Sequence, residues 1–381
     1  MTFLPEDLLT AIHDRAPGYD RDNTFFTEDL EALRAAGYLS AHVPTGLGGA
    51  GLSLRELVTE QSRLAAAAPA TALAVNMHQV WCGVGRVLHE RGDDTLDFLL
   101  REAAAGEVFA FGISERGNDL VLFGSATQAR PDGEGGYRFH GTKIFTSLAP
   151  AWTRLGVHGI EDATASADGE PRIVYGFVTR DGTETKDDWD TLGMRATQSR
   201  TTVLDGAHAP ADRVVRKLPP GPHPDPFVFG IFACFELLLS SVYLGIAQRA
   251  LDLAVETVKT RTSMKTGGVY SHDPDIRWRL ATASMALETA LTQLHALAAD
   301  IDHQVDHGPR WFAKLAGTKV RATETAKDVV ETAIRVSGGA SYFTRNELSR
   351  LYRDVLAGLF HPSDDESAHA TVATALLGPL P

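Results

Sequence analysis

The sequence has 381 residues, of which 44% are hydrophobic and 22% charged, a balance typical of a folded globular protein and not of a disordered or collagen-like chain. Asp and Glu outnumber Lys and Arg by 49 to 36, which gives a formal net charge of −13. No stretch gathers the basic residues into a stripe, so we expect no nucleic-acid partner. At roughly 150 residues per domain, the length predicts two or three structural units.

The first 105 residues have the periodicity of helices. Their apolar positions recur at helical spacing in four segments, at 28–36, 54–67, 71–90 and 95–105. One cysteine, Cys82, lies in this region and the other, Cys234, lies further on, both in apolar surroundings without metal-ligand spacing. We therefore expect buried, inert thiols and no metal site.

Residues 106–220 change to short apolar runs separated by turn residues. Strands are predicted at 137–140, 144–146, 173–178 and 201–204, with a hairpin turn at 132–136. Several short strands at this spacing predict a small antiparallel sheet or barrel.

The rest of the chain, residues 221–381, is helical again. Helices are predicted at 227–262, 273–303, 309–337 and 347–358, with a last one from 363. The sequence Ser363-Asp364-Asp365-Glu366 predicts a capping box that begins this last helix. The fold class is therefore α+β, with an N-terminal helical domain (1–105), a β domain (106–220) and a C-terminal helical bundle (221–381).

Two further features concern the surroundings of the protein. The apolar run 227–247 has the length of a membrane span, but Glu236 lies at its middle and basic flanks are lacking. We interpret it as a helix buried in the bundle, with no membrane span. The start of the chain lacks the basic and apolar segments of a signal peptide, so we expect a cytoplasmic protein.

Four side chains are candidates for chemistry. Glu236 is either a buried carboxylate with a raised pKa, suited to proton transfer, or the partner of an arginine on a neighbouring helix. His361 lies on a loop between two helices, where functional residues are common. His78 in an apolar helix and Ser147 at a strand end are unremarkable alone, and none of the four specifies a reaction.

Taken together, the segments resemble the acyl-CoA dehydrogenase superfamily along nearly the whole chain. The motifs that carry the resemblance are Val43–Ser53, Gly141–Ser147, Leu192–Arg195 with Ala209–Pro210, and Ser337–Gly339 with Arg350 and Arg353–Asp354. The resemblance implies a flavoprotein with FAD between the β domain and a C-terminal four-helix bundle.

The resemblance also implies which residues line the flavin ring. Phe111, Ile113 and Ser114 match the strand beside the isoalloxazine. Phe145 matches the aromatic side chain that packs on the ring, and Ser147 matches the hydroxyl that bonds flavin N5. A hydrogen-bond donor at N5 tunes the charge of the reduced ring.

A second group matches residues that bind the FAD of a neighbouring subunit. Arg261 and Ser263 match the residues that reach the pyrophosphate, and Arg335 and Gly339 match positions around the same dinucleotide. Arginine suits this role because its guanidinium binds phosphate with two parallel hydrogen bonds. A shared site implies a homodimer or homotetramer.

The departures from the family pattern concern the catalytic base. The usual catalytic glutamate falls on Pro362, and a second family location for it falls on Phe235. Glu236 is adjacent to Phe235, but one residue along a helix is a rotation of about 100°. His361, placed after Arg353-Asp354, resembles instead a histidine of the flavin monooxygenase branch.

Three functions remain open at this stage. The first is oxidation of an acyl thioester or similar carbonyl, with Glu236 or His361 as the base and hydride transfer to flavin N5, and with an electron-transfer flavoprotein as partner. The second is a reduced-flavin monooxygenase in which Ser147 and His361 flank a C4a-hydroperoxyflavin, a role suited to an imidazole that titrates near neutral pH, with His78 on the substrate side and a flavin reductase as partner. The third is binding of flavin or ligand without turnover.

Overall fold

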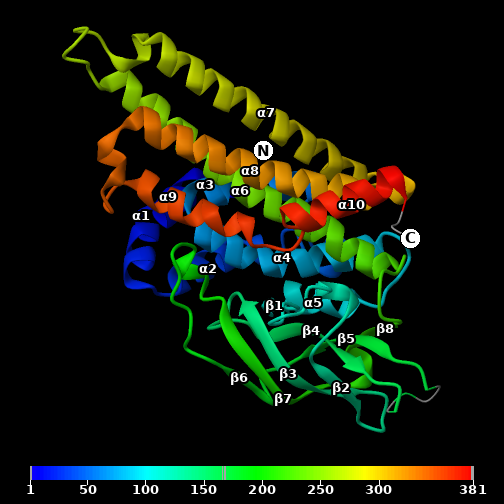
Figure 1. Cartoon of the computed structure of the whole chain (residues 1–381). Helices are drawn as coiled ribbons and strands as arrows, with labels where there is room; N and C mark the ends of the chain where they lie inside the picture. The colour runs from blue at the N-terminus through cyan, green and yellow to red at the C-terminus, as the bar shows by residue number, and fades with distance from the viewer. Residues whose placement is uncertain (1, 165, 167–168, 379–381) are drawn as a thin grey trace.

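The computed structural model describes residues 2–164, 166 and 169–378, in which helices lie above a β-sheet (Figure 1). The N-terminal helices are α1 (Glu6–Asp22), α2 (Thr27–Ala35), α3 (Leu54–Ala67), α4 (Pro69–His89) and α5 (Asp97–Ala104). Ser53 begins α3 with a capping box, in which its hydroxyl accepts from the Glu56 amide and the Glu56 carboxylate accepts from the Ser53 amide.

The described residues of the middle region form one eight-stranded sheet in the order β6-β7-β3-β2-β4-β5-β8, with β1 paired to β4. Its strands are β1 (Phe109–Gly112), β2 (Gln128–Pro131), β3 (Tyr137–Thr146), β4 (Arg154–Glu161), β5 (Arg172–Val178), β6 (Thr183–Thr185), β7 (Arg200–Ala209) and β8 (Val214–Leu218). Most pairs are antiparallel, but β1 and β2 each run parallel to β4. The predicted hairpin at 132–136 joins β2 to β3, and the two strands predicted at 137–140 and 144–146 are one strand, β3.

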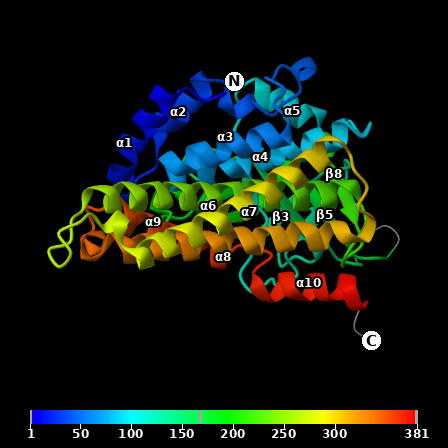
Figure 2. The ribbon, with the colours of Figure 1, turned by 90° about the horizontal axis from the view of Figure 1, so that it is seen from above.

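The C-terminal region consists of α6 (Pro226–Thr260), α7 (Pro274–Asp302), α8 (Trp311–Ser337), α9 (Glu347–Val355) and α10 (Asp365–Leu377). Figures 1 and 2 place α6 in the middle, between the N-terminal helices α3 and α4 and the C-terminal helix α8, and α6 contacts all three. By length and composition α6 alone among the described helices could cross a membrane, but 89% of its most apolar window is buried inside the protein. The predicted α+β fold class is thus confirmed.

Trp81 on α4 joins the helices to the sheet. Its indole nitrogen donates to the carbonyl oxygen of Ala110 in β1 at 2.9 Å. Its ring packs against Phe111 and Phe177 of the sheet and Phe227 of α6, with centroids 4.9–6.2 Å apart. A Cβ added to Gly156 would lie 2.4 Å from the indole, so β4 approaches Trp81 as closely as only glycine allows.

The capping box predicted at Ser363 is wrong. The helix begins one residue later, because the Asp364 side chain is the cap and accepts from the Ser367 amide at 3.0 Å. Ser363 precedes the cap with φ +54, a left-handed conformation that non-glycine residues rarely adopt. Its hydroxyl is therefore free to bond elsewhere.

A buried ion pair ties β3 to the segment after β1. Lys143 donates to Glu115 Oε1 at 2.7 Å and to the His158 carbonyl oxygen at 2.7 Å, and both side chains are almost fully buried. Burial alone would raise the pKa of Glu115, but the charge and hydrogen bond of Lys143 and a bond from Thr127 lower it to about 2. Glu115 and Lys143 thus have a structural role within the sheet.

We predict that Lys143→Met lowers the free energy of unfolding by about 3–5 kcal/mol, because it leaves the Glu115 carboxylate buried without its cation. Chemical denaturation at neutral pH measures the change. The double variant Lys143→Met/Glu115→Gln is the control and should recover part of the loss. A loss below about 1 kcal/mol in the single variant would show that the remaining hydrogen bonds satisfy the carboxylate.

Candidate functional site

The end of β3 presents an exposed aromatic ring next to a buried chain of hydroxyls. Phe145 is 58% exposed, has φ +56 and meets Trp189 edge-on with ring centroids 6.1 Å apart. Ser147 Oγ lies 2.7 Å from Ser199 Oγ, which donates to Thr197 Oγ1 at 2.7 Å. A strained backbone that holds an aromatic side chain in solvent is typical of a binding site rather than of packing.

The strand predicted to line the flavin, β1 and its continuation, lies beside this segment. The Ile144 amide donates to the Ser114 carbonyl oxygen at 2.9 Å, which pairs the two chains just before Phe145. Ile113 is buried. The Phe111 ring stacks on Phe235 of α6 with centroids 5.6 Å apart, so this strand reaches the central helix.

The segment that carries the hydroxyl chain is fixed to α9. The Met194 amide donates to Asp354 Oδ1 at 2.6 Å, and a Cβ added to Gly193 would lie 2.2 Å from the Arg353 carbonyl oxygen. Burial raises the pKa of Asp354 to about 6, against the opposing charge of Arg350. Two motifs that lie 160 residues apart in the sequence are thereby in contact.

The residues after α9 form what we call the His361 loop, which consists of a short 3-10 helix (Leu356–Leu359) and residues 360–363. The hydroxyl of Tyr243 on α6 lies 2.7 Å from His361 Nε2. Lys319 on α8 donates to the carbonyl oxygens of Gly358 and His361, both at 3.1 Å. Nδ1 of His361 has no partner among the described residues.

His361 is a neutral imidazole in this environment. Burial, followed by the nearby charge of Lys319, lowers its pKa to about 3. The expectation of an imidazole that titrates near neutral pH is therefore wrong. At neutral pH the ring carries no positive charge, and its Nδ1 can donate or accept a hydrogen bond according to the tautomer.

Glu236 is buried beside the His361 loop. The Ser363 hydroxyl donates to its Oε1, whereas Oε2 has no hydrogen-bond partner. Burial raises the pKa of Glu236 to about 7, against the Ser363 hydrogen bond and the charge of Lys319. The expected arginine partner is wrong: the neighbouring cation is a lysine. Glu236 therefore faces α8 and the loop, while the adjacent Phe235 faces Phe111.

His78 lies in the core of the molecule. Its Nε2 bonds the Leu39 carbonyl oxygen at 2.7 Å, and the Phe109 amide donates to its Nδ1 at 3.1 Å. Burial lowers its pKa to about 4. Both ring nitrogens bond the backbone, so His78 aligns β1 with the helices. No ring nitrogen is left for the substrate contact that the sequence suggested.

Two of the predicted phosphate-binding arginines meet in one pocket. This cavity of about 320 Å³ is lined by Arg261, Tyr270, Ile276, Arg279, Arg335, Val336 and Gly338. Arg261 donates to the Ser337 carbonyl oxygen at 2.6 Å, and its guanidinium carbon lies 4.7 Å from the centroid of the Tyr270 ring. Arg279, which the sequence analysis missed, has no partner among the described residues. The predicted residues Ser263 and Gly339 do not line the cavity.

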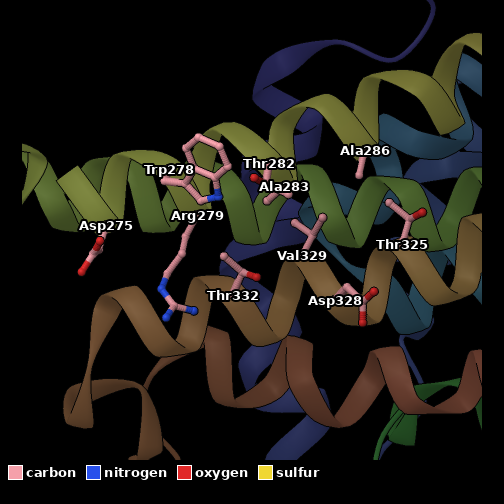
Figure 3. Close-up of a pocket in the computed structure, with 10 residues that line it drawn as sticks. All are labelled: Asp275, Trp278, Arg279, Thr282, Ala283, Ala286, Thr325, Asp328, Val329 and Thr332. Carbon is pink, nitrogen blue, oxygen red and sulfur yellow. The ribbon is translucent and has the colours of Figure 1, made fainter. Parts of the chain in front are cut away.

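A larger cavity of about 600 Å³ lies between α7 and α8, and none of the predicted site residues lines it (Figure 3). Trp278, which is 77% exposed, and Arg279 come from α7, and Asp328 and Thr332 come from α8. Most residues in the first half of α7 are exposed, and they include the large apolar side chains of Trp278 and Met285.

The residues at the end of β3 fit a flavin. An exposed aromatic ring, the hydroxyl chain from Ser147 and the buried Thr146 Oγ1, which has no hydrogen-bond partner, together suit a planar ring with a polar edge. The arginine pocket has the chemistry needed for a phosphate group.

Comparison with known proteins gives two family matches. The N-terminal domain of acyl-CoA dehydrogenase matches residues 8–107, and its C-terminal domain matches residues 237–365. An L-evernosamine nitrososynthase of Micromonospora is 32% identical, over 93% of this chain and 85% of its own. An amino sugar nitrososynthase of Streptomyces rubradiris is 31% identical, over 92% of this chain and 83% of its own.

Solved structures agree with these matches. The structure of KijD3 in complex with FMN and a dTDP-linked 3-amino-4-keto sugar has a TM-score of 0.82 at 31% identity, and the match covers 98% of this chain and 91% of that one. The butyryl-CoA dehydrogenase of Megasphaera elsdenii has a TM-score of 0.84 at 21% identity, with 98% and 99% covered, and shares the fold.

We predict that the contribution of Glu236 to the stability of the protein falls as the pH rises from about 4.5 to 7, because the folded state holds the proton of Glu236 more tightly than the unfolded state does. The buried neutral histidines contribute the opposite slope, so Glu236→Gln isolates this term and should change the stability difference between pH 4.5 and pH 7 by roughly 1–3 kcal/mol relative to the native protein. Denaturation at a series of pH values measures it, with the exposed Glu366→Gln on α10 as the control. An unchanged slope in Glu236→Gln would contradict the buried, proton-binding carboxyl.

Proposed function

The chain belongs to the acyl-CoA dehydrogenase family, and we propose that it is a reduced-flavin-dependent monooxygenase that oxygenates the nitrogen of a small-molecule amine. It is a flavin-dependent enzyme, as its relatives are. The observation that carries the proposal is the neutral His361 next to Pro362, at the place where a dehydrogenase has its glutamate. The nitrososynthase names of two relatives support an amine as substrate, with amino sugars the first class to test.

The reaction balances with one molecule of O2. When bound, the reduced flavin supplies two electrons, so that one oxygen atom goes to the amine nitrogen and the other leaves as water. This chain's own residues would bind and orient the flavin: Phe145 would pack on the ring and Ser147 would bond its polar edge. The neutral imidazole of His361 holds a proton at Nδ1 or Nε2 and exchanges it near the reacting oxygen without adding charge.

A dehydrogenase remains the second candidate, because Glu236 has a pKa of about 7, which suits a base. Its carboxylate, however, is bonded by Ser363 and lies on a different side of α6 from Phe235. Deprotonation of a substrate that lies against the flavin strand needs a carboxylate that faces Phe111. The contacts therefore favour the monooxygenase.

The cofactor of this proposal is FAD rather than FMN. The arginine pocket at the start of α7 is lined by Arg261, Arg279 and Arg335, of which Arg335 is paired with Glu331, and this cluster of guanidinium groups suits the second phosphate of a dinucleotide. In a homodimer or homotetramer this pocket would serve the dinucleotide of the neighbouring subunit. A flavin reductase would supply the reduced form.

We predict that acyl-CoA thioesters do not bleach the flavin of the purified protein under anaerobic conditions. With a flavin reductase, a nicotinamide donor and O2, amino sugars should gain one oxygen atom, which mass spectrometry detects. His361→Ala should lower product per flavin oxidised about a hundredfold, as loss of a general acid or base does, with hydrogen peroxide released instead. Bleaching by an acyl-CoA that Glu236→Gln abolishes would establish the dehydrogenase instead.

We also predict that Arg261→Gln weakens FAD binding about tenfold to a hundredfold and leaves FMN binding unchanged, because a charge-assisted contact to phosphate is lost. Titration calorimetry of the apoprotein with each flavin measures the effect. Arg277→Gln on the exposed side of α7 is the matched control. Equal losses for FAD and FMN would show that the pocket does not bind the second half of the dinucleotide.

A further inference from the structure

The His361 loop is attached to two helices by side chains that the proposed chemistry does not use. Lys319 of α8 bonds the loop through two backbone carbonyls, at Gly358 and at His361 itself. Glu236 and Tyr243, two turns apart on α6, bond Ser363 and the His361 ring. Three contacts therefore hold His361. Tyr243 bonds its ring, Lys319 bonds its carbonyl oxygen, and Glu236 bonds Ser363, which lies two residues further along.

The backbone of the loop is shaped for these contacts. Ser363 adopts φ +54, which orients its hydroxyl toward Glu236 instead of toward the first turn of α10. A Cβ added to Gly358 would lie 2.9 Å from the Tyr243 ring and 2.9 Å from Thr323 on α8, so the loop also packs tightly on both helices. Strain at Ser363 persists because the neighbouring contacts determine the conformation.

The charges in this region are arranged around one buried cation. Lys319 is 1% exposed, and among the described residues it donates to two carbonyl oxygens and to no carboxylate. Burial lowers the pKa of Lys319, and the nearby carboxyl groups of Glu236 and then Asp364 oppose that shift. Glu236 thus lies beside the lysine and, through its hydrogen bond from Ser363, fixes the end of the loop.

We infer that Glu236, Ser363 and Lys319 are positioning residues that hold His361 in its working orientation, and that Glu236 is not the base of the reaction. The inference rests on the proposed function, in which His361 faces the reacting oxygen. In this role Glu236 accepts the hydrogen bond from Ser363 and exchanges no proton with the substrate. Glutamine can therefore replace it, whereas leucine cannot.

Substitutions at Ser363 test the contribution of its hydroxyl separately from that of its left-handed backbone. Ser363→Gly relieves the left-handed backbone but removes the hydroxyl, and Ser363→Asn tolerates that backbone and restores a donor. Thr371→Ala is the matched control, because it removes a hydroxyl from α10 without contact to Glu236. Glu236→Gln and Glu236→Leu test the acceptor in the same way.

The first readout needs no turnover. Diethyl pyrocarbonate modifies accessible imidazoles, and mass spectrometry of the peptide that contains His361 gives the rate for this residue in the full-length protein. We expect Ser363→Gly and Glu236→Leu to raise the rate about fivefold, with faster hydrogen exchange in 356–364, because the loop opens more often. Ser363→Asn, Glu236→Gln and Thr371→Ala should stay near the native rate.

The second readout is amine oxygenation. Ser363→Gly should lower kcat with little change in KM for the amine, and Ser363→Asn should restore kcat, because the orientation of His361 and not substrate binding is altered. If Ser363→Gly changes neither the His361 modification rate nor the exchange of the loop, the inference is wrong, whatever the activity. If Glu236→Gln abolishes turnover with an unchanged modification rate, Glu236 is the base and the inference is equally wrong.

The two proposals fail in different ways. Absence of amine oxygenation in the native protein, with the loop effects present, would overturn the proposed function and leave the positioning contacts established. Oxygenation in the native protein without the loop effects would support the proposed function and overturn the positioning role of these residues. Lys319→Met extends the test to the third residue, and the Ser363 variants decide the result if that variant does not fold.

Discussion

The structure depends on the burial of one helix on all sides. α6 lies between α3 and α4 on one side and α8 on the other, and almost all of its residues from Phe227 to Ala247 are buried. Removal of so much apolar surface from water stabilises the layers against each other, and it fixes the rotation of the helix as well as its place. Phe235 therefore faces the sheet at Phe111, whereas Glu236 and Tyr243 face the His361 loop. A polar helix in the same place would have no such fixed orientation.

The two sides of the proposed flavin site are connected through α9. Asp354 holds the Met194 amide, the segment that follows carries the hydroxyls bonded to Ser147, and the chain after α9 becomes the His361 loop. A shift of α9 would consequently move both candidate residues, Ser147 and His361, in the same direction. The contacts of α9 with both segments thus help to set the distance between them.

The sequence predicts the long elements well because their periodicity is strong. The helices at 54–67 and 227–262 agree with α3 and α6 to within two residues, since each combines an apolar pattern with clear ends. The strand β4 was missed because nearly all of its residues are buried on both faces, so its sequence shows no alternation of polar and apolar residues. Motif resemblance located Phe145 and Ser147, but no local pattern reveals that Ser363 turns away from its helix or that Lys319 bonds backbone carbonyls. Those contacts join residues that lie 39 to 127 positions apart, and the packing of α6 against α8 brings them together.

The rotation of α6 also decides which of its side chains can reach a molecule bound at the sheet. Because adjacent residues on a helix point about 100° apart, a carboxylate at 235 would lie against the flavin strand, whereas the carboxylate at 236 is sequestered behind it. A single step in helical register therefore decides whether a carboxylate on α6 can reach a molecule that lies against β1 or is confined to contacts within the bundle.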